Sequence, residues 1–297
     1  MITSSSWAQR ETDTLGPVLF KDVDAMRDWV RHRQSAGQQI GLVPTMGALH
    51  EGHLSLVSNA LGNTDACVVS IFVNPTQFGP NEDFEVYPRP LDADLKKLAS
   101  AGVDAVFMPD RMVMYPDSFG THIEPPLVAS RLEGLHRPTH FRGVATIVLK
   151  LLQIIPADMT FLGQKDFQQC LVIEQMVRDL NVPTKIVRCP TVREADGLAM
   201  SSRNRYLDAD QRQRASAIVR GLKAVSAAFE DGQHSVSELE LILGARCAEL
   251  DRVDYAVIVD VETLEPIDLI RQDAVAMVAA WLGSTRLIDN QILRFSR

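Results

Sequence analysis

Two histidines stand where the sequence turns from a strand into a helix. In His50-Glu-Gly-His53 they are three residues apart and follow a short apolar run that Pro44 ends. Leu54 and Val57 come next at helical spacing, so a loop leads from a buried strand into a helix that begins near Gly52 or His53. Helix N-termini present unpaired N–H groups and a partial positive charge, which bind phosphate. The segment predicts a phosphate-binding loop with two imidazoles beside it.

The same four residues fit the H-x-G-H signature of adenylate-forming and nucleotidyl-transferring enzymes. With 7 histidines and 17 glycines in 297 residues, about 0.01 chance matches are expected per chain. The alternative interpretation is that both histidines only cap the helix or are hydrogen-bonded within the loop.

Two further stretches could act with the histidines. Gln164-Lys165-Asp166 lies at a second strand-to-helix junction, and Met200-Ser201-Ser202-Arg203 lies in a polar loop of small residues. The second stretch resembles the mobile K-M-S-K-S-type loop that accompanies H-x-G-H in class I synthetases. Alone, Lys165 could be a solvated helix-end lysine, and the serine-containing loop could be a flexible linker between domains.

Composition limits the function classes. With 46% hydrophobic and 23% charged residues the sequence is that of an ordinary globular protein, and its net charge of -8 argues against nucleic acid as a partner. The four cysteines are too far apart in sequence to suggest a zinc site or disulfides, which predicts buried thiols in a reducing cytoplasm. Residues 1–17 read as a disordered polar tail without a signal peptide, and no run is long enough to span a membrane.

The order of predicted strands and helices along the sequence indicates an α/β fold. Apolar runs at 18–20, 40–43, 66–73, 104–109, 159–162 and 184–190 alternate with helical patterns around 23–30, 54–61, 91–98, 144–155 and 166–180. This alternation predicts a Rossmann-like catalytic domain with a parallel sheet over residues 18–190. Residues 191–297 then form a smaller C-terminal α/β domain, with helices at 209–229 and 237–250 and strands at 254–261, 274–282 and 285–292. Ser237 is the expected N-cap of the second helix.

One long connection interrupts the alternation. Residues 115–143 are rich in proline and predicted to be irregular; they carry the basic side chains Arg131, His136, Arg137, His140 and Arg142. Connections of that length in a compact domain are usually functional. A solvated crossover or a dimer contact is the alternative.

Four stretches together resemble one enzyme family, the pantoate–β-alanine ligases (pantothenate synthetases). They are Pro44-Thr-Met-Gly-Ala-Leu-His-Glu-Gly-His53, Phe72-Val-Asn-Pro-Thr-Gln-Phe-Gly79, Gly163-Gln-Lys-Asp-Phe-Gln-Gln169 and Arg193-Glu-Ala-Asp-Gly-Leu-Ala-Met-Ser-Ser-Arg-Asn-Arg-Tyr-Leu207. The resemblance runs from about residue 18 to the C-terminus. It implies a cytoplasmic homodimer that uses ATP and Mg²⁺ to join pantoate to β-alanine through a pantoyl adenylate, releasing AMP and pyrophosphate.

The resemblance also implies residue roles. His53 would be the proton donor, and His50, Lys165 and Arg203 would share the catalytic work. Gln77 would bind both pantoate and β-alanine, and Gln169 would bind pantoate. The residues that would contact ATP are Pro44, Thr45, Met46, Gly47, Ala48, Leu49, His50, Glu51, Gly52, His53, Gly163, Gln164, Lys165, Asp166, Val192, Met200, Ser201, Ser202 and Arg203. Because a reactive adenylate must also be kept from water, we expect the C-terminal domain and its loop to close over ATP as a lid.

Two positions depart from the family pattern. Gln164 stands where many members have glutamate, and Asp92-Ala-Asp94 stands where some relatives have three acidic residues, so the magnesium ligands stay unassigned. Two other functions remain open: a nucleotidyl transferase that keeps the adenylyl group on its product, and a catalytically silent nucleotide-binding protein. A tRNA-charging enzyme is disfavoured by the acidity and by the lack of an anticodon-binding extension.

Overall fold

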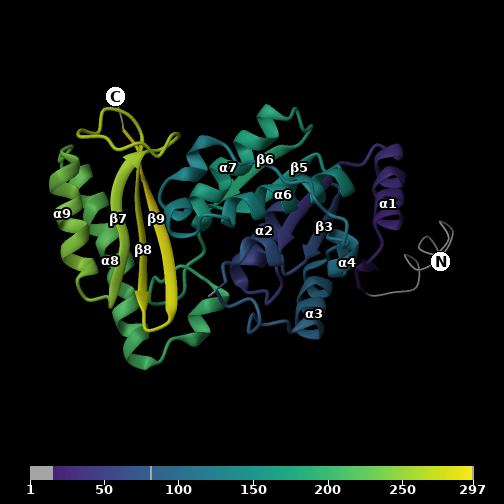
Figure 1. Cartoon of the computed structure of the whole chain (residues 1–297), viewed down its shortest axis with the longest axis horizontal. Coiled ribbons are helices and arrows are strands. Elements are labelled where there is room, and N and C mark those ends of the chain that lie inside the picture. The colour runs from purple at the N-terminus through teal and green to yellow at the C-terminus, as the bar shows by residue number, and fades with distance from the viewer. Residues whose placement is uncertain (1–15, 81, 296–297) are drawn as a thin grey trace. The chain divides into compact units, whose positions relative to one another are not determined.

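The computed structural model describes residues 16–80 and 82–295. The predicted disordered tail lies outside these residues except for Gly16 and Pro17. Contacts between residues divide the chain into two compact units (Figure 1). The first comprises the described residues up to Gln164 together with Gln168–Pro190, and the second comprises Lys165–Phe167 and the described residues from Thr191 onward.

The first unit contains a six-stranded parallel sheet, which confirms the predicted fold class. Its strands lie in the order β1-β4-β3-β2-β5-β6, and each recorded pairing is parallel. The strands are β1 (Val18–Phe20), β2 (Ile40–Thr45), β3 (Ala66–Ile71), β4 (Ala105–Phe107), β5 (Met159–Gly163) and β6 (Lys185–Cys189). These bounds lie within a few residues of the apolar runs in the sequence.

Helices cover both faces of this sheet, which is why its strands are apolar without alternation. Ile40 and Leu42 of β2 point into one core, shared with α1 (Val23–Ser35), α6 (His140–Ile154) and α7 (Phe167–Asp179). Val43, the next residue, points into the other core, shared with α2 (Glu51–Asn63) and α3 (Leu91–Ala101). Successive side chains of a strand point to opposite faces, so every residue of β2 before Pro44 is buried.

The strand order reverses at β2. Neighbours of β2 on one side are β3 and β4, and on the other side β5 and β6. In open α/β sheets, ligands bind at the carboxyl ends of the strands where the order reverses. The loops that leave β2, β3 and β5 therefore mark the expected site, and the predicted histidine loop follows β2.

The described residues of the second unit form two α-helices, short 3-10 turns and an antiparallel sheet. Its strands are β7 (Arg252–Asp260), β8 (Ala274–Leu282) and β9 (Thr285–Leu293), and its helices are α8 (Ala209–Glu230) and α9 (Val236–Cys247). Both helices and the sheet contribute to one apolar core. The predicted N-cap Ser237 is wrong, because the extended residue before α9 is Ser235 and Ser237 lies inside the helix.

The long connection is more ordered than the sequence suggested. The prediction that residues 115–143 are irregular is partly wrong: η2 (Leu127–Ser130) and α5 (Glu133–His136) lie within them, and α6 begins at His140 rather than at residue 144. Two short helices precede this stretch, η1 (Pro75–Gln77) and α4 (Arg111–Met114). The early start of α6 places His140 and Phe141 in buried positions.

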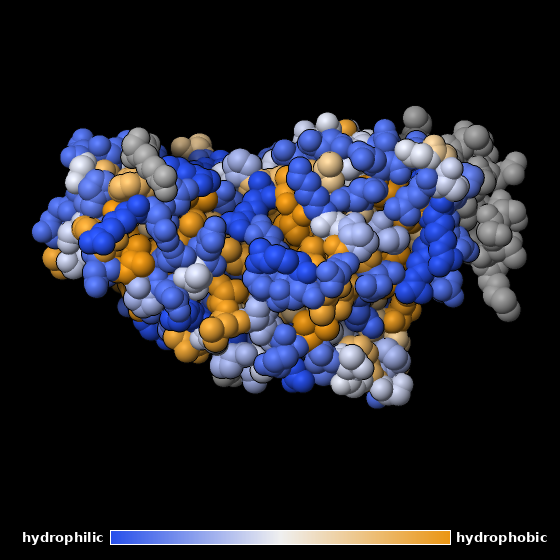
Figure 2. Space-filling view, turned by 90° about the horizontal axis from the view of Figure 1, so that it is seen from above, coloured by the Kyte–Doolittle hydropathy of each residue, from blue (hydrophilic) through white to orange (hydrophobic). Residues whose placement is uncertain are grey.

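Surface and interior agree with the composition. All four cysteines are buried, as predicted. The face drawn in Figure 2 is largely hydrophilic with hydrophobic residues scattered among the polar ones, as is usual for globular proteins. None of the helices in the described part of the chain is long and apolar enough to cross a membrane.

Candidate active site

The loop after β2 has a left-handed backbone. Gly47 has a φ of 83° and Ala48 a φ of 50°, a region that non-glycine residues rarely occupy. The Thr45 hydroxyl donates to the Ser70 carbonyl at 2.7 Å and accepts from the Gly47 N–H at 3.2 Å. The turn is thereby fastened to the end of β3.

Two side chains of helix α3 form hydrogen bonds with the same turn. The buried carboxylate of Asp94 accepts from the Ala48 N–H and from the Leu49 N–H, each at 2.8 Å. Lys97, one turn further along α3, donates to the Leu49 carbonyl at 2.5 Å. These three bonds compensate the unfavourable φ of Ala48 and fix the residues immediately before His50.

We predict that Asp94→Ala destabilises the first unit strongly. Each charge-assisted hydrogen bond is worth about 1.5–3 kcal/mol, so losing both should lower the free energy of unfolding by about 3 kcal/mol or more. Asp92→Ala, an exposed neighbour in the same helical turn, is the control and should cost a few tenths of a kcal/mol at most. Urea unfolding of both variants measures the difference. Equal stabilities would show that the carboxylate does not hold the turn.

Both histidines lie at the start of α2. His50 is the N-cap residue, and its backbone N–H points to Nδ1 of His53 at 3.4 Å. The two rings lie 4.1 Å apart between centroids. The capping geometry that the sequence left open is therefore present. It does not exclude a chemical role, because the same helix end also presents backbone N–H groups to an anion.

The loop after β3 brings Gln77 next to the histidine loop. Gln77 Nε2 lies 3.3 Å from the sulfur of Met46, and Gln77 Oε1 accepts from the side chain of Asn74 at 3.0 Å. Asn74 is buried and in turn accepts from the Tyr115 hydroxyl at 2.8 Å. Burial raises the pKa of Tyr115, so this phenol stays protonated and donates. Met46 and Gln77, predicted from separate motifs, thus belong to one cluster.

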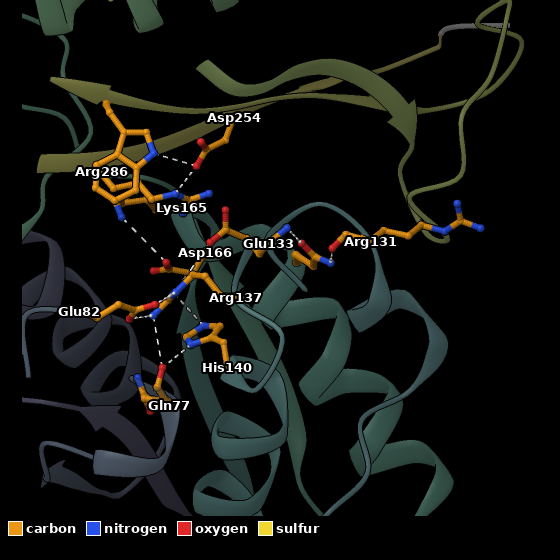
Figure 3. Close-up of polar contacts among 12 residues, drawn as sticks. Gln77, Glu82, Arg131, Glu133, Arg137, His140, Lys165, Asp166, Asp254 and Arg286 are labelled. Carbon is orange, nitrogen blue, oxygen red and sulfur yellow. Dashed lines mark hydrogen bonds and ion pairs between the residues drawn. The ribbon is translucent and has the colours of Figure 1, made fainter. Parts of the chain in front are cut away.

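Arg137 and His140 hold the backbone of Gln77 (Figure 3). His140 Nδ1 lies 2.9 Å from the Gln77 carbonyl, and Arg137 donates to the same oxygen at 3.3 Å. Arg137 also forms a two-pronged pair with Glu82, at 2.7 and 2.6 Å. Burial and the neighbouring Arg137 charge lower the pKa of His140 from 6.5 to about 4. His140 is therefore neutral at physiological pH.

The lowered pKa of His140 makes stability depend on pH. Between pH 6.5 and about pH 4 the unfolded chain protonates this residue and the folded chain does not. The contribution to stability is therefore full above pH 6.5 and is lost as the pH falls toward 4. From pH 7 to pH 5 we expect the wild type to lose about 2 kcal/mol more unfolding free energy than His140→Asn. Parallel urea titrations measure this, and identical losses would contradict the neutral buried state.

The two adjacent glutamines of α7 differ in burial and in their contacts. Gln168 is buried, and its amide accepts from the Glu133 N–H at 3.0 Å and donates to the Val128 and Arg131 carbonyls, each at 2.8 Å. Gln168 thus organises the turn between η2 and α5. Gln169, the predicted pantoate ligand, is half-buried on the same helix.

Lys165 and Asp166 form part of η3 (Gln164–Asp166) after β5. Their contacts group them with the second unit, where the Asn290 side chain of β9 donates to the Lys165 carbonyl at 3.0 Å. The Lys165 ammonium lies 3.9 Å from the Asp166 carboxylate. Gly163 and Gln164 stay with the first unit at the carboxyl end of β5, next to β2.

The predicted Met200–Arg203 loop lies in the second unit. The Met200 N–H donates to the Val192 carbonyl at 3.0 Å, so these two predicted ATP contacts are neighbours. Ser201 is the N-cap of η4 (Ser202–Tyr206), and its hydroxyl accepts from the Arg203 N–H at 3.3 Å. The structure thus gathers the predicted residues of this region into one turn.

Ion pairs anchor this loop, which argues against an unstructured linker. Arg193 forms a two-pronged pair with buried Asp289, at 2.6 and 3.2 Å. Glu194 accepts from Arg212 and from the buried side chain of Asn204, each at 2.6 Å. Burial would raise the pKa of Glu194, but these hydrogen bonds lower it below the usual value. The start of the loop is therefore tied to α8 and β9, and Asn204 at its other end is tied back to Glu194.

Sequence reasoning left the contacts of several site residues unassigned. Asp94 was noted only as part of an acidic stretch and Asn74 only within a family motif, and no local pattern marks Tyr115. The contacts of Asp94 with Ala48 and of Tyr115 with Asn74 span long stretches of chain. Arg137 and His140 were noticed only as basic residues in a long connection. Among residues 16–80 and 82–295, no group of three or more His, Cys, Asp or Glu side chains is arranged to hold a metal ion.

The parallel sheet and the H-x-G-H loop at its reversal point define an α/β protein of Rossmann-like fold, with its expected ligand site at that loop. The sequence model for pantoate-beta-alanine ligase matches residues 18–292. Pantothenate synthetase of Rhodopirellula baltica is 58% identical over 92% of this chain and 98% of its own. The crystal structure of pantothenate synthetase from Thermus thermophilus superposes with a TM-score of 0.88 at 40% identity, covering 94% of this chain and 100% of that one.

A further solved relative is the ligase from Francisella tularensis, complexed with beta-gamma ATP and beta-alanine. It is 37% identical with a TM-score of 0.73, and covers 94% of this chain and 99% of its own. The chain belongs to the pantoate–β-alanine ligase family. It is accordingly an enzyme of pantoate–β-alanine ligation, as its sequence resemblance implied.

Proposed function

We propose that this enzyme uses ATP to activate pantoate as pantoyl adenylate and then transfers the pantoyl group to β-alanine. The observation that carries the proposal is the cluster at the carboxyl ends of β2 and β3, where the H-x-G-H loop lies beside Met46 and Gln77. The complex of the Francisella tularensis relative with a form of ATP and β-alanine supports these two substrates.

In the first step a pantoate carboxylate oxygen would attack the α-phosphorus of ATP, and the bond to pyrophosphate would break. Two anions must approach each other, so fixed positive charge and N–H donors around the phosphates are the main requirement. The N-terminus of α2 with His50 and His53 offers such donors. Lys165, Ser201, Ser202 and Arg203 would add others, by their resemblance to the family motifs, and His53 would act as proton donor.

In the second step the neutral amine of β-alanine would attack the acyl carbonyl of the adenylate. The acyl–oxygen bond would break, AMP would leave, and the amine would lose a proton. Alignment is the main contribution of the enzyme to this step. Gln77 and Gln169 would select pantoate, because amides that hydrogen-bond its hydroxyls reject analogues that lack them.

Magnesium fits this scheme as an ion that arrives with the nucleotide. Mg²⁺ is usually held by substrate phosphates with one or two carboxylates, and it would neutralise charge on the phosphate oxygens. Asp94, which belongs to the Asp92-Ala-Asp94 stretch, already accepts two backbone hydrogen bonds with its two oxygens. We therefore assign Asp94 to the loop rather than to the metal.

Isotope exchange between pyrophosphate and ATP tests the proposal. With pantoate present and β-alanine absent, we expect pantoate-dependent exchange, and after addition of β-alanine we expect AMP and pantothenate in equal amounts. Absence of exchange from protein that still binds ATP would rule out the adenylate. AMP found in the product rather than released would instead favour the nucleotidyl-transferase alternative.

A further inference from the structure

We infer that His140 and Arg137 are positioning residues that set the place of Gln77, and through it the enzyme's use of pantoate. The inference rests on the proposed role of Gln77. Neither side chain needs to touch a substrate for this purpose. Arg137 lies in the connection between β4 and α6 and His140 at the start of α6, and both reach the backbone of Gln77 from a distant part of the sequence.

The contacts of His140 fix its protonation pattern. A guanidinium can only donate hydrogen bonds, so the 3.2 Å contact between Arg137 Nη1 and His140 Nε2 makes Nε2 the acceptor. The proton of the neutral ring is then on Nδ1, which donates to the Gln77 carbonyl at 2.9 Å. The neutral ring thus accepts a hydrogen bond from Arg137 and donates one to Gln77, and it cannot exchange these two roles.

Arg137 fastens two points of the loop after β3. It donates to the Gln77 carbonyl and forms the two-pronged pair with Glu82 (Figure 3). Its side chain is 16% exposed and that of Glu82 25%, so the pair is shielded from most solvent screening. The nearby carboxylate of buried Glu133 lies 3.8 Å from Arg137. Glu82 and Glu133 therefore compensate the charge that Arg137 brings into this site.

The Gln77 side chain depends on this backbone. Its Oε1 accepts from Asn74, whose own amide also donates to the Gly143 carbonyl of α6 at 3.2 Å. Helix α6 thus controls Gln77 twice, through His140 at the carbonyl and through Asn74 at the amide. A shift of this amide by roughly 1 Å would cost about 100-fold in rate.

Two replacements of His140 test whether a donor at the place of Nδ1 is what positions Gln77. His140→Asn keeps an N–H donor near the place of Nδ1, whereas His140→Gln moves the amide toward the place of Nε2. We expect His140→Gln to raise the KM for pantoate about 10- to 100-fold with the KM for ATP changed less than about threefold. His140→Asn should stay within about threefold of the wild type in both constants. His122→Asn, an exposed histidine of the same connection, is the control.

Gln77→Ala and Arg137→Lys complete the set. Arg137→Lys keeps the charge but loses the planar fork, so it should also raise the KM for pantoate and serves if a His140 variant does not fold. Equal effects of His140→Asn and His140→Gln, or wild-type constants in both, would overturn the inference. An impaired Gln77→Ala beside a wild-type His140→Gln would overturn the inference alone, whereas a wild-type Gln77→Ala would remove the role of Gln77 and the inference together.

Discussion

Replacing Lys165 by alanine is expected to lower the rate of ATP–pyrophosphate exchange about 10²- to 10³-fold, the usual cost of removing one donor that stabilises developing charge. Lys165 follows β5, the strand that pairs with β2 at the reversal of the sheet. Its carbonyl is held by Asn290, which fixes the backbone from which the ammonium extends. In the proposed function the Lys165 ammonium lies at the ATP phosphates, where a pre-positioned cation needs no reorganisation as the phosphate charge shifts, so its removal should be harmful.

The loss should be chemical rather than structural. Lys165 belongs to none of the apolar cores, so Lys165→Ala should keep the thermal stability of the wild type. Lys185→Ala removes an exposed lysine from β6 and is the matched control, with unchanged exchange expected. Exchange at the wild-type rate in Lys165→Ala would remove this residue from the mechanism. A fall in exchange together with a large fall in melting temperature would assign it a structural role instead.

Local patterns were sufficient for the sheet and for most helices. The runs that form β2 and β3 are continuous and apolar because both faces of the sheet are covered. Each residue of such a strand is buried on one face or the other, so the pattern can be recognised from the strand's own sequence. Asp22 accepts from the N–H groups of Asp24 and Ala25, which starts α1 where the periodic pattern begins. Gly102, which follows the helical pattern of 91–98, ends α3 at a φ of 81°.

The contacts that shape the site act across the chain and leave no local signal. Asp94 reaches Ala48 over 46 residues, and His140 reaches Gln77 over 63 residues. The start of α6 was missed for the same reason. Its first turn contains one apolar residue, Phe141, beside two polar residues and a glycine, so apolar periodicity does not mark it, whereas Gly143 packs against the backbone of η1 in the folded chain.

Adjacent residues of one type show the limit of sequence reasoning. Gln168 and Gln169 are identical in type, yet Gln168 saturates its amide with three backbone partners inside the first unit. Which glutamine is buried depends only on which side of α7 faces the turn before α5. The family resemblance points to Gln169, which is half-buried, and its role as a pantoate ligand stays a prediction.

Gly143→Ala is expected to lower kcat/KM for pantoate about 100-fold by displacing Gln77. A Cβ at this position would lie 2.3 Å from the Thr76 carbonyl oxygen and 2.7 Å from the Gln77 nitrogen. These distances are far below the roughly 3.5–4.0 Å at which non-bonded heavy atoms pack. The atoms in the way belong to the backbone of η1, so no side chain can turn aside. Either α6 or η1 must move, and both carry the contacts that hold Gln77.

The two opposing free-energy terms of Gly143→Ala together predict a net loss of stability. Alanine in place of glycine favours a helix by up to about 1 kcal/mol, but overpacking a buried contact costs about 1–3 kcal/mol. Gly62→Ala in α2 isolates the first term, since a Cβ there meets nothing within 4 Å, and it should leave activity unchanged and stability equal or higher. Pantoate kinetics and melting temperatures of the two variants decide the matter. A Gly143→Ala enzyme with wild-type pantoate kinetics would mean that α6 does not place Gln77, because the substitution cannot be accommodated without moving either α6 or η1.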